Sequence, residues 1–591
     1  MELNWSLKEL YSSFDSDEFK SDIKRLNDMI ADINIWATEV VKNNEDLTTK
    51  LEEYIKRYSK YTDIIHKLYT FAELSISVNT KDTTALKYSD ILDKKSSELV
   101  ESSTKIERWI SNIPELDSVI NGSKLLKDHE FILKEIVEKS KYLLSDKEES
   151  IIANMKNTGS NAWLKLKDNL ISSLMVDIEE DGVIKELPLT VVLNMAYDEN
   201  SEVRKNGYEA EIAAYSKVEE GVAAALNGIK GEVISVCKFR GYKSPLEMTL
   251  IESRMDEESL NAMLSAMVDS LPIFRKYLRR KGELLGHKNG LPFYDMYAPV
   301  ADAEMKFTYE EAGSFIEKNF NTFSKNLGTF ARKAIDNNWI DVYPKQGKVG
   351  GAFCEGIHSL GESRVLLNFG GQFGDVVTMA HELGHGFHNE CLKGETTLNA
   401  DYPMPIAETA STFCETIIKK AAVKEASKEE ALAILESEIS DCTQVIVDIY
   451  SRFLFEKSVF EKRKVSALGV EEIKELMLEA QREAYGDGLD PDYLHPYMWA
   501  WKPHYYSADT NYYNFPYAFG LLFSKGLYAE YLKRGDSFPE AYEKLLAITG
   551  KNNLADVTKI MGINIRSKDF WKESLKTIEE DIEKFIELSK K

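Results

Sequence analysis

The chain has 591 residues, of which 43% are hydrophobic and 29% are charged, so it can bury a large core and is not mainly disordered. It carries 74 Lys and Arg against 98 Asp and Glu, which gives a net charge of −24. Such a surface repels nucleic-acid phosphates and anionic lipid heads. Composition therefore favours a globular enzyme or scaffold and argues against nucleic acid or a membrane as a partner.

The composition also predicts a helical protein of a reducing compartment. Only 14 prolines and 32 glycines occur, and Leu, Glu, Lys and Ala are abundant. The five cysteines are odd in number and form no CxxC pair. The N-terminal sequence shows no export signal, and nowhere do about 18 apolar residues run together. We therefore expect a cytoplasmic protein, whose oligomeric state the sequence does not reveal.

The first third of the chain has helical periodicity. Asp15, followed by Glu18, resembles a capping box, and apolar residues then recur every three or four positions to residue 33. The same period recurs over 51–68 and between about 83 and 155, although no exact repeat is evident. This pattern predicts long amphipathic helices packed against one another.

The periodicity changes twice further along the chain. Alternating apolar residues over 174–178, then Asp181-Gly182 and Val183-Ile184, predict a short β-hairpin. Helical periodicity resumes near residue 190, so we expect an N-terminal helical region over 1–190 and a second region over 191–591. Glycines cluster over 345–374, and RVLLNF at 364–369 is a strand candidate between them.

Directly after the glycine-rich stretch comes His381-Glu382-Leu383-Gly384-His385. Residues i and i+4 share one face of a helix, so both imidazoles can bind one metal ion while Glu382 lies beside its water. The alternative is a pair of surface histidines on an amphipathic helix. Gly384 argues against it, because a glycine lowers helix stability by roughly 1 kcal/mol relative to alanine.

A catalytic zinc site needs a third protein ligand and one open position. His388 is seven residues from His381, about 10 Å along a helix, so its ring does not readily converge on the same ion. Glu408, one turn inside a helix expected to start at about Ile406, is the favoured candidate, since small neighbours allow that helix to approach closely. Glu415, seven residues later, either orients a ligand imidazole or is a solvated surface charge.

Such a metal, with Glu382 as general base, supports attack of water on an amide. The segment over 501–520 is rich in phenol and imidazole groups. These groups either pack in a core or stabilise a tetrahedral oxyanion.

Three motifs, TMAHELGHGFH, PIAETASTFCE and HYYSADTNYYNFPYAFG, occur in this order, and together they resemble the oligoendopeptidase F group of the thimet-oligopeptidase-like zinc metallopeptidases. The resemblance covers roughly residues 190–590. It implies a mainly α fold, a two-lobed helical zincin with a deep central channel and a small β-sheet next to the active-site helix. It also implies one zinc ion and the cleavage of short unstructured peptides.

Carried over by motif, the resemblance implies site residues within a catalytic domain over 191–591. The zinc ligands would be His381, His385 and Glu408, and the general base Glu382. His504 and the tyrosines of NYYNFPY resemble substrate-binding and oxyanion-donating residues. We favour Tyr513 and Tyr517, because their i, i+4 spacing places both phenols on one face if the segment is helical.

The strand RVLLNF resembles the edge strand that pairs with the substrate backbone in this family. The sequence therefore predicts a zinc endopeptidase. A helical zinc carboxypeptidase and a non-catalytic peptide-binding scaffold are the alternatives. A base between two metal ligands argues against the scaffold, because binding alone does not need one.

Overall fold

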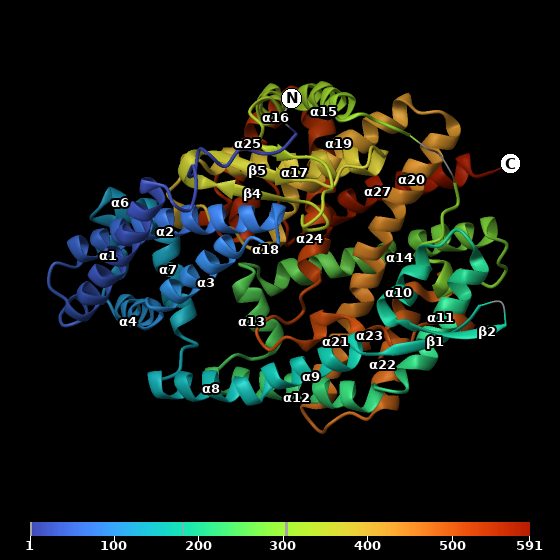
Figure 1. The fold of residues 1–591 in the computed structure, drawn as a ribbon, viewed down its shortest axis with the longest axis horizontal. Coiled ribbons are helices and arrows are strands. Elements are labelled where there is room, and N and C mark those ends of the chain that lie inside the picture. The colour runs from blue at the N-terminus through green and yellow to red at the C-terminus, as the bar shows by residue number, and fades with distance from the viewer. Residues whose placement is uncertain (1–2, 181, 302–304, 591) are drawn as a thin grey trace. The chain divides into compact units, whose positions relative to one another are not determined.

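The computed structural model describes residues 3–180, 182–301 and 305–590, and it is mainly helical, as composition and periodicity predict (Figure 1). The chain forms two compact units, each assembled from three stretches. The first unit comprises Met1–Lys141, Met305–Ala421 and Glu530–Gly562, and the second comprises Tyr142–Glu304, Ala422–Ala529 and Ile563–Lys591. The predicted division of the chain at residue 190 stays a prediction.

The first unit holds helices from both the N-terminal and the middle part of the chain. They are α1 (Asp17–Val40), α2 (Leu47–Val78), α3 (Thr83–Ser97), α4 (Val100–Ser111), α5 (Leu116–Asn121), α6 (Lys124–Asp128), α7 (Glu130–Ser140), α15 (Tyr309–Phe323), α16 (Lys325–Asp336), α17 (Phe373–Leu392), α18 (Met404–Ala407), most of α19 (Thr409–Glu425), α25 (Phe538–Leu546) and α26 (Leu554–Lys559).

The helix predicted over 15–33 is α1, but its capping residue differs from the prediction. Ser16, not Asp15, is the N-cap, and its side chain accepts a hydrogen bond from the backbone N–H of Phe19. The predicted capping box is therefore wrong by one residue, since Ser16 is the residue whose hydroxyl reaches the free N–H groups of the first turn. The apolar face buries Phe19, Leu26 and Ile30, as the period predicts.

The second unit contains the remaining helices and a hairpin. Its helices are α8 (Asp146–Thr158), α9 (Ser160–Ser172), α10 (Leu189–Asn194), α11 (Ser201–Tyr215), α12 (Glu219–Arg240), α13 (Pro245–Glu252), α14 (Glu257–Leu284), α20 (Lys428–Thr443), α21 (Ile449–Arg463), α22 (Val470–Tyr485), α23 (Met498–Trp501), most of α24 (Phe515–Arg534) and α27 (Lys568–Leu588). The predicted hairpin is confirmed as β1 (Met175–Glu180) paired antiparallel with β2 (Val183–Pro188). Asp181 of its predicted turn lies outside the described residues.

The first unit contains the three-stranded sheet that the glycine-rich stretch predicts. Its order is β3 (Ile340–Asp341), β5 (Glu362–Leu366) and β4 (Phe353–Ile357), with β5 parallel to β3 and antiparallel to β4. β5 is thus the central strand, and the expectation that RVLLNF is an edge strand is wrong. The error has a non-local cause, because β3, which pairs with this edge, precedes the glycine-rich stretch in the sequence. Helix α17 packs on β4 and β5, which confirms the predicted sheet beside the motif helix.

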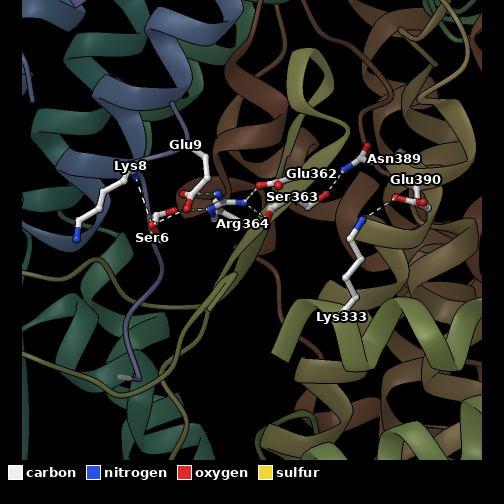
Figure 2. A network of polar contacts seen from close by, with 9 residues as sticks. All are labelled: Ser6, Lys8, Glu9, Lys333, Glu362, Ser363, Arg364, Asn389 and Glu390. Carbon is white, nitrogen blue, oxygen red and sulfur yellow. Dashed lines mark hydrogen bonds and ion pairs between the residues drawn. The ribbon is translucent and has the colours of Figure 1, made fainter. Parts of the chain in front are cut away.

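A buried arginine connects this sheet to the N-terminal segment (Figure 2). The Arg364 side chain is fully buried; its Nε donates to the carbonyl of Ser6 at 2.6 Å, and its other nitrogens reach Glu9 at 3.1 Å and Glu362 at 2.9 Å. Ser363, which precedes Arg364 in β5, accepts a hydrogen bond from Asn389 of α17. The guanidinium therefore holds the N-terminal segment to the strand behind the motif helix.

Replacing Arg364 with methionine should lower the free energy of unfolding by about 2 to 3 kcal/mol, because it leaves the Ser6 carbonyl and two carboxylates without their buried donor. Urea unfolding measures this loss. Arg332→Met is the matched control, since Arg332 of α16 pairs with Asp336 and Glu317 at the surface, and it should change stability by less than about 1 kcal/mol. Equal losses for both variants would contradict the assignment.

Two further sequence expectations can be checked here. The five cysteines form no disulfide. Among the residues that the structure describes, no helix is both long and apolar enough to cross a membrane.

Candidate metal centre

Helix α17 brings the two histidines of the HELGH motif into contact. Asp375 accepts a hydrogen bond from the backbone N–H of Gln372 at the start of this helix, which runs without a break through the motif to Leu392. The Nε2 atoms of His381 and His385 lie 3.1 Å apart, and their rings meet edge to face. The predicted shared face is therefore formed, and both ring nitrogens point at one place.

Glu408 reaches the same place, from a backbone position that differs from the prediction. It is not one turn inside a helix but is the junction between the short α18 and α19, with a ψ of 2°. Its Oε2 lies 3.3 Å from Nε2 of His381 and 3.5 Å from Nε2 of His385. The hydroxyl of Ser411 donates to this same oxygen at 3.0 Å and fixes the carboxylate.

The close approach of the two segments depends on Gly384. A Cβ at this position would lie 2.6 Å from the carbonyl oxygen of Ala410 and 2.7 Å from Cα of Ser411. These are backbone atoms, which cannot move aside as a flexible side chain can. The glycine that weakens the helix therefore permits Glu408 to lie against the two histidines.

We expect Gly384→Ala to lower stability by about 1 to 3 kcal/mol and to weaken metal binding, because the added methyl group pushes α19 and Glu408 away. Gly374→Ala on the same helix is the control, since nothing lies within 4 Å of its Cβ position. Thermal unfolding and metal titration of both variants measure the two effects. A Gly384→Ala protein with normal stability and metal affinity would contradict the steric argument.

Glu415 is placed as the orienting alternative predicts. Its Oε1 lies 2.7 Å from Nδ1 of His381, the ring nitrogen that faces away from the other predicted ligands. Its Oε2 pairs with Nζ of Lys419 at 2.9 Å. Burial opposes protonation of His381, but the hydrogen bonds to Glu408 and Glu415 outweigh it and raise its pKa to about 10. The carboxylates therefore make the centre attractive to a cation.

Glu382 lies beside these groups in a drier environment. Glu382 is only 5% exposed, and one of its carboxylate oxygens lies within 4.8 Å of a ring nitrogen of His381 and of His385. Burial raises its pKa, partly offset by the two histidines. Sequence reasoning missed one neighbour, Cys354 of β4, whose thiol pKa is raised by burial and by Glu382. Only the strand pairing reveals it, since 28 positions separate the two residues in the sequence.

His388 is held apart from the predicted ligands. It is fully buried, its Nε2 lies 2.8 Å from the hydroxyl of Thr549, and its ring stacks on Tyr402 at 4.1 Å. Burial lowers its pKa to about 3. Because Thr549 donates its own proton to the carbonyl of Leu546, His388 donates from Nε2 to Thr549.

The other predicted site residues lie in the second unit, where they contact one another. The rings of His504 and Tyr513 stack at 4.9 Å, and the hydroxyls of Tyr513 and Tyr517 lie 2.9 Å apart. The two phenols lie together as predicted, but not on one helix face, because Tyr517 lies in α24 and Tyr513 lies in the turn before it. Burial, with Arg452 and other nearby cations, lowers the pKa of His504 to about 4, so its ring is neutral.

The loop that carries Tyr513 is fixed by a buried ion pair. Tyr512 has a φ of 51°, a left-handed conformation that is unfavourable for a tyrosine. Its N–H donates to Oε2 of Glu456 at 3.0 Å, while Lys230 donates to Oε1 of Glu456 at 2.7 Å and to the side chain of Asn511 at 3.0 Å. These contacts hold the backbone on the N-terminal side of Tyr513.

Comparisons with known proteins identify the family of the chain. The model of peptidase family M3 matches residues 194–577, and the model named Oligopeptidase F matches residues 104–175. The chain therefore belongs to peptidase family M3.

Relatives of known name cover nearly the whole chain. Oligopeptidase PepF of Bacillus subtilis is 24% identical over 99% of this chain and 87% of its own length. An oligoendopeptidase F homolog of Lactococcus lactis is 24% identical over 99% of this chain and 97% of its own. The crystal structure of oligoendopeptidase-F from Enterococcus faecium has a TM-score of 0.70 at 17% identity, over 96% of this chain and 99% of that one. It shows the same fold.

Proposed function

We propose that the protein is a zinc-dependent endopeptidase that hydrolyses internal bonds of short unstructured peptides. The observation that carries this proposal is the triangle of His381 Nε2, His385 Nε2 and Glu408 Oε2, with sides of 3.1, 3.3 and 3.5 Å. Ligands about 2.0 to 2.1 Å from a tetrahedral zinc ion are separated by about 3.3 to 3.4 Å. The three groups therefore fit one zinc ion and leave its fourth position open.

In the proposed reaction Glu382 moves the proton. A zinc ion in this site would acidify a water molecule and polarise the scissile carbonyl. Glu382 accepts the proton of the attacking water on its carboxylate and then donates it to the nitrogen of the leaving amine. Burial of Glu382 suits both steps, because a raised pKa makes the carboxylate a better proton acceptor near neutral pH.

We assign the remaining predicted residues to the substrate. Tyr513 and Tyr517 donate their phenol protons to the carbonyl oxygen as it becomes an oxyanion, and His504 supports the ring of Tyr513 by stacking. The substrate backbone pairs with β4, the edge strand, in place of the central β5. Main-chain pairing accepts many sequences, which suits a peptidase of broad specificity.

The buried pair under this loop gives a testable requirement. Lys230→Met should reduce kcat/KM by up to about 100-fold, because Glu456 loses its partner and the Tyr512 backbone is free to relax, which misplaces Tyr513. Lys238→Met, at an exposed position of the same helix α12, is the control and should retain full activity. Normal kcat and KM in a folded Lys230→Met protein would rule out the positioning role.

Mass-spectrometric mapping of cuts in a mixed peptide library tests the function itself. We expect internal cuts, a limit on peptide length and loss of all turnover after chelation, with recovery on adding zinc. Peptides blocked at both termini separate the alternatives, since an endopeptidase cuts them and a carboxypeptidase does not. A peptide-binding scaffold would bind the library without cutting it.

We propose a cytoplasmic location, where short peptides arise from protein turnover.

A further inference from the structure

The second unit contains a partly open cavity of about 410 Å³, a size typical of small-molecule sites. Its walls come from α10, the turn at Met195–Tyr197, α11, the turn at Phe293–Asp295 and the segment 495–502. Six of its sixteen lining residues carry a Phe, Tyr or Trp ring. They are Tyr197, Tyr208, Phe293, Tyr294, Tyr297 and Trp501.

Most polar groups of the wall already have partners. Nε of Arg204 donates to Asp295 at 2.8 Å, and Nη1 of Arg204 donates to two backbone carbonyls. The hydroxyl of Tyr208 donates to the carbonyl of Leu494 at 2.7 Å. Glu211 lies 3.0 Å from Nε2 of His495 and accepts from Tyr215 at 2.9 Å. These groups shape the cavity without needing a ligand.

Lys502 is the exception. The residue is only 7% exposed, and among the described residues its ammonium has no hydrogen-bond or ion-pair partner. It lies 4.6 Å from the ring centre of Trp501, whose indole N–H is buried and also has no partner in the part of the chain that the structure describes. A lysine that is so largely buried without a counter-charge is costly. Two donors of the wall, the Lys502 ammonium and the Trp501 indole N–H, are thus available to a ligand.

The charges around Lys502 leave room for a ligand anion. Burial is the main cause that lowers the pKa of Lys502 to about 8, and the nearby Arg452 is the second. Asp448 and Glu211 act in the opposite direction. These two carboxylates form their own close contacts, Asp448 with Arg452 and Glu211 with His495. A ligand carboxylate would supply the charge that the protein leaves out.

We propose that this cavity binds a small carboxylate with an aromatic body, its carboxylate on Lys502 and its ring among the tyrosines. The chemistry is that of an aromatic amino acid, either free or as the C-terminal residue of a short peptide. Tyrosine and tryptophan faces favour a planar ring by edge-to-face or offset contacts. A charge-assisted hydrogen bond to a buried ammonium supplies the orientation.

Isothermal titration of the full-length protein tests this site with four probes: L-phenylalanine, Gly-Gly-Phe, N-acetyl-phenylalanine and its carboxamide. We expect N-acetyl-phenylalanine to bind and the carboxamide to bind at least about tenfold more weakly, because a hydrogen bond to a charged group is worth about 1.5 to 3 kcal/mol. Binding of phenylalanine alone among the first two probes assigns the free amino acid, and binding of the tripeptide assigns a peptide end.

Two variants locate the binding. Lys502→Met should weaken it at least about tenfold, and Lys205→Met, at a half-buried lysine of α11 outside the cavity lining, should not change it. Ala196→Phe fills the cavity without touching Lys502, and it should also abolish binding if Lys502→Met fails to fold. All titrations are repeated after chelation. Binding that disappears with the metal, an equally bound carboxamide, unchanged affinity in folded Lys502→Met, or no binding at millimolar concentration would each overturn the proposal.

Discussion

Glu382→Gln is expected to lower kcat by about 10²- to 10⁴-fold while the metal stays bound. The glutamine keeps the size and the hydrogen-bonding reach of the side chain but cannot accept a proton from water. His381, His385 and Glu408 do not depend on Glu382 for their positions, since their contacts run to one another, to Ser411 and to Glu415. The loss should therefore appear in turnover and not in metal content.

Turnover assays with a fluorogenic peptide measure kcat, and elemental analysis of the purified variant measures its metal content. The control is Glu390→Gln, a partly exposed glutamate later on the same helix that pairs with Lys393. It should leave kcat unchanged. Comparable kcat in Glu382→Gln would remove this residue from the mechanism, and loss of metal would mean that it acts as a ligand.

Glu408→Ala is expected to produce the largest loss of metal affinity. It removes one corner of the ligand triangle and leaves two imidazoles, so we expect a loss greater than the roughly 10- to 100-fold expected for Glu415→Ala. Glu415 contacts the outer nitrogen of His381 and is not a corner of the ligand triangle, which makes its variant a graded control. Competition with a chromophoric chelator measures both affinities.

Full metal occupancy in Glu408→Ala would make His388 the candidate for the third ligand. The structure argues against this outcome, because Nε2 of His388 is engaged by Thr549 and its ring is stacked on Tyr402. The double variant with His388→Gln would then decide the question. Metal loss in Glu408→Ala alone, with metal retained in His388→Gln, is the result that we expect.

The contacts along one helix could be predicted from the sequence. Helical geometry alone places His381 and His385 on one face, and it predicts that Glu415, on the following helix, shares a face with the third candidate. The small residues near Glu408 also predict a close approach of its segment, but the structure alone shows that Gly384 is the residue that permits it. These predictions succeeded because a helix converts spacing in sequence into distance in space.

The errors and omissions concern contacts that no local pattern encodes. RVLLNF was expected at an edge, but strand order depends on where Ile340–Asp341 pairs. Glu408 lies between two helices because Ser411 and the close approach to α17 decide the local backbone. The pair of Lys230 and Glu456 spans 226 positions, and either residue alone resembles an ordinary surface charge.

The first unit's core also limits the order in which the chain can fold. Phe19 and Leu68, from the N-terminal helices, share one hydrophobic cluster with Ile357 and Leu366 of the sheet. The final stretch of this unit ends at Gly562. During synthesis, the first 141 residues therefore leave the ribosome long before their partners exist. The N-terminal helices can form the cluster between Ala37 and Leu133 early, but the core that they share with the sheet can form only after residue 366 has been made.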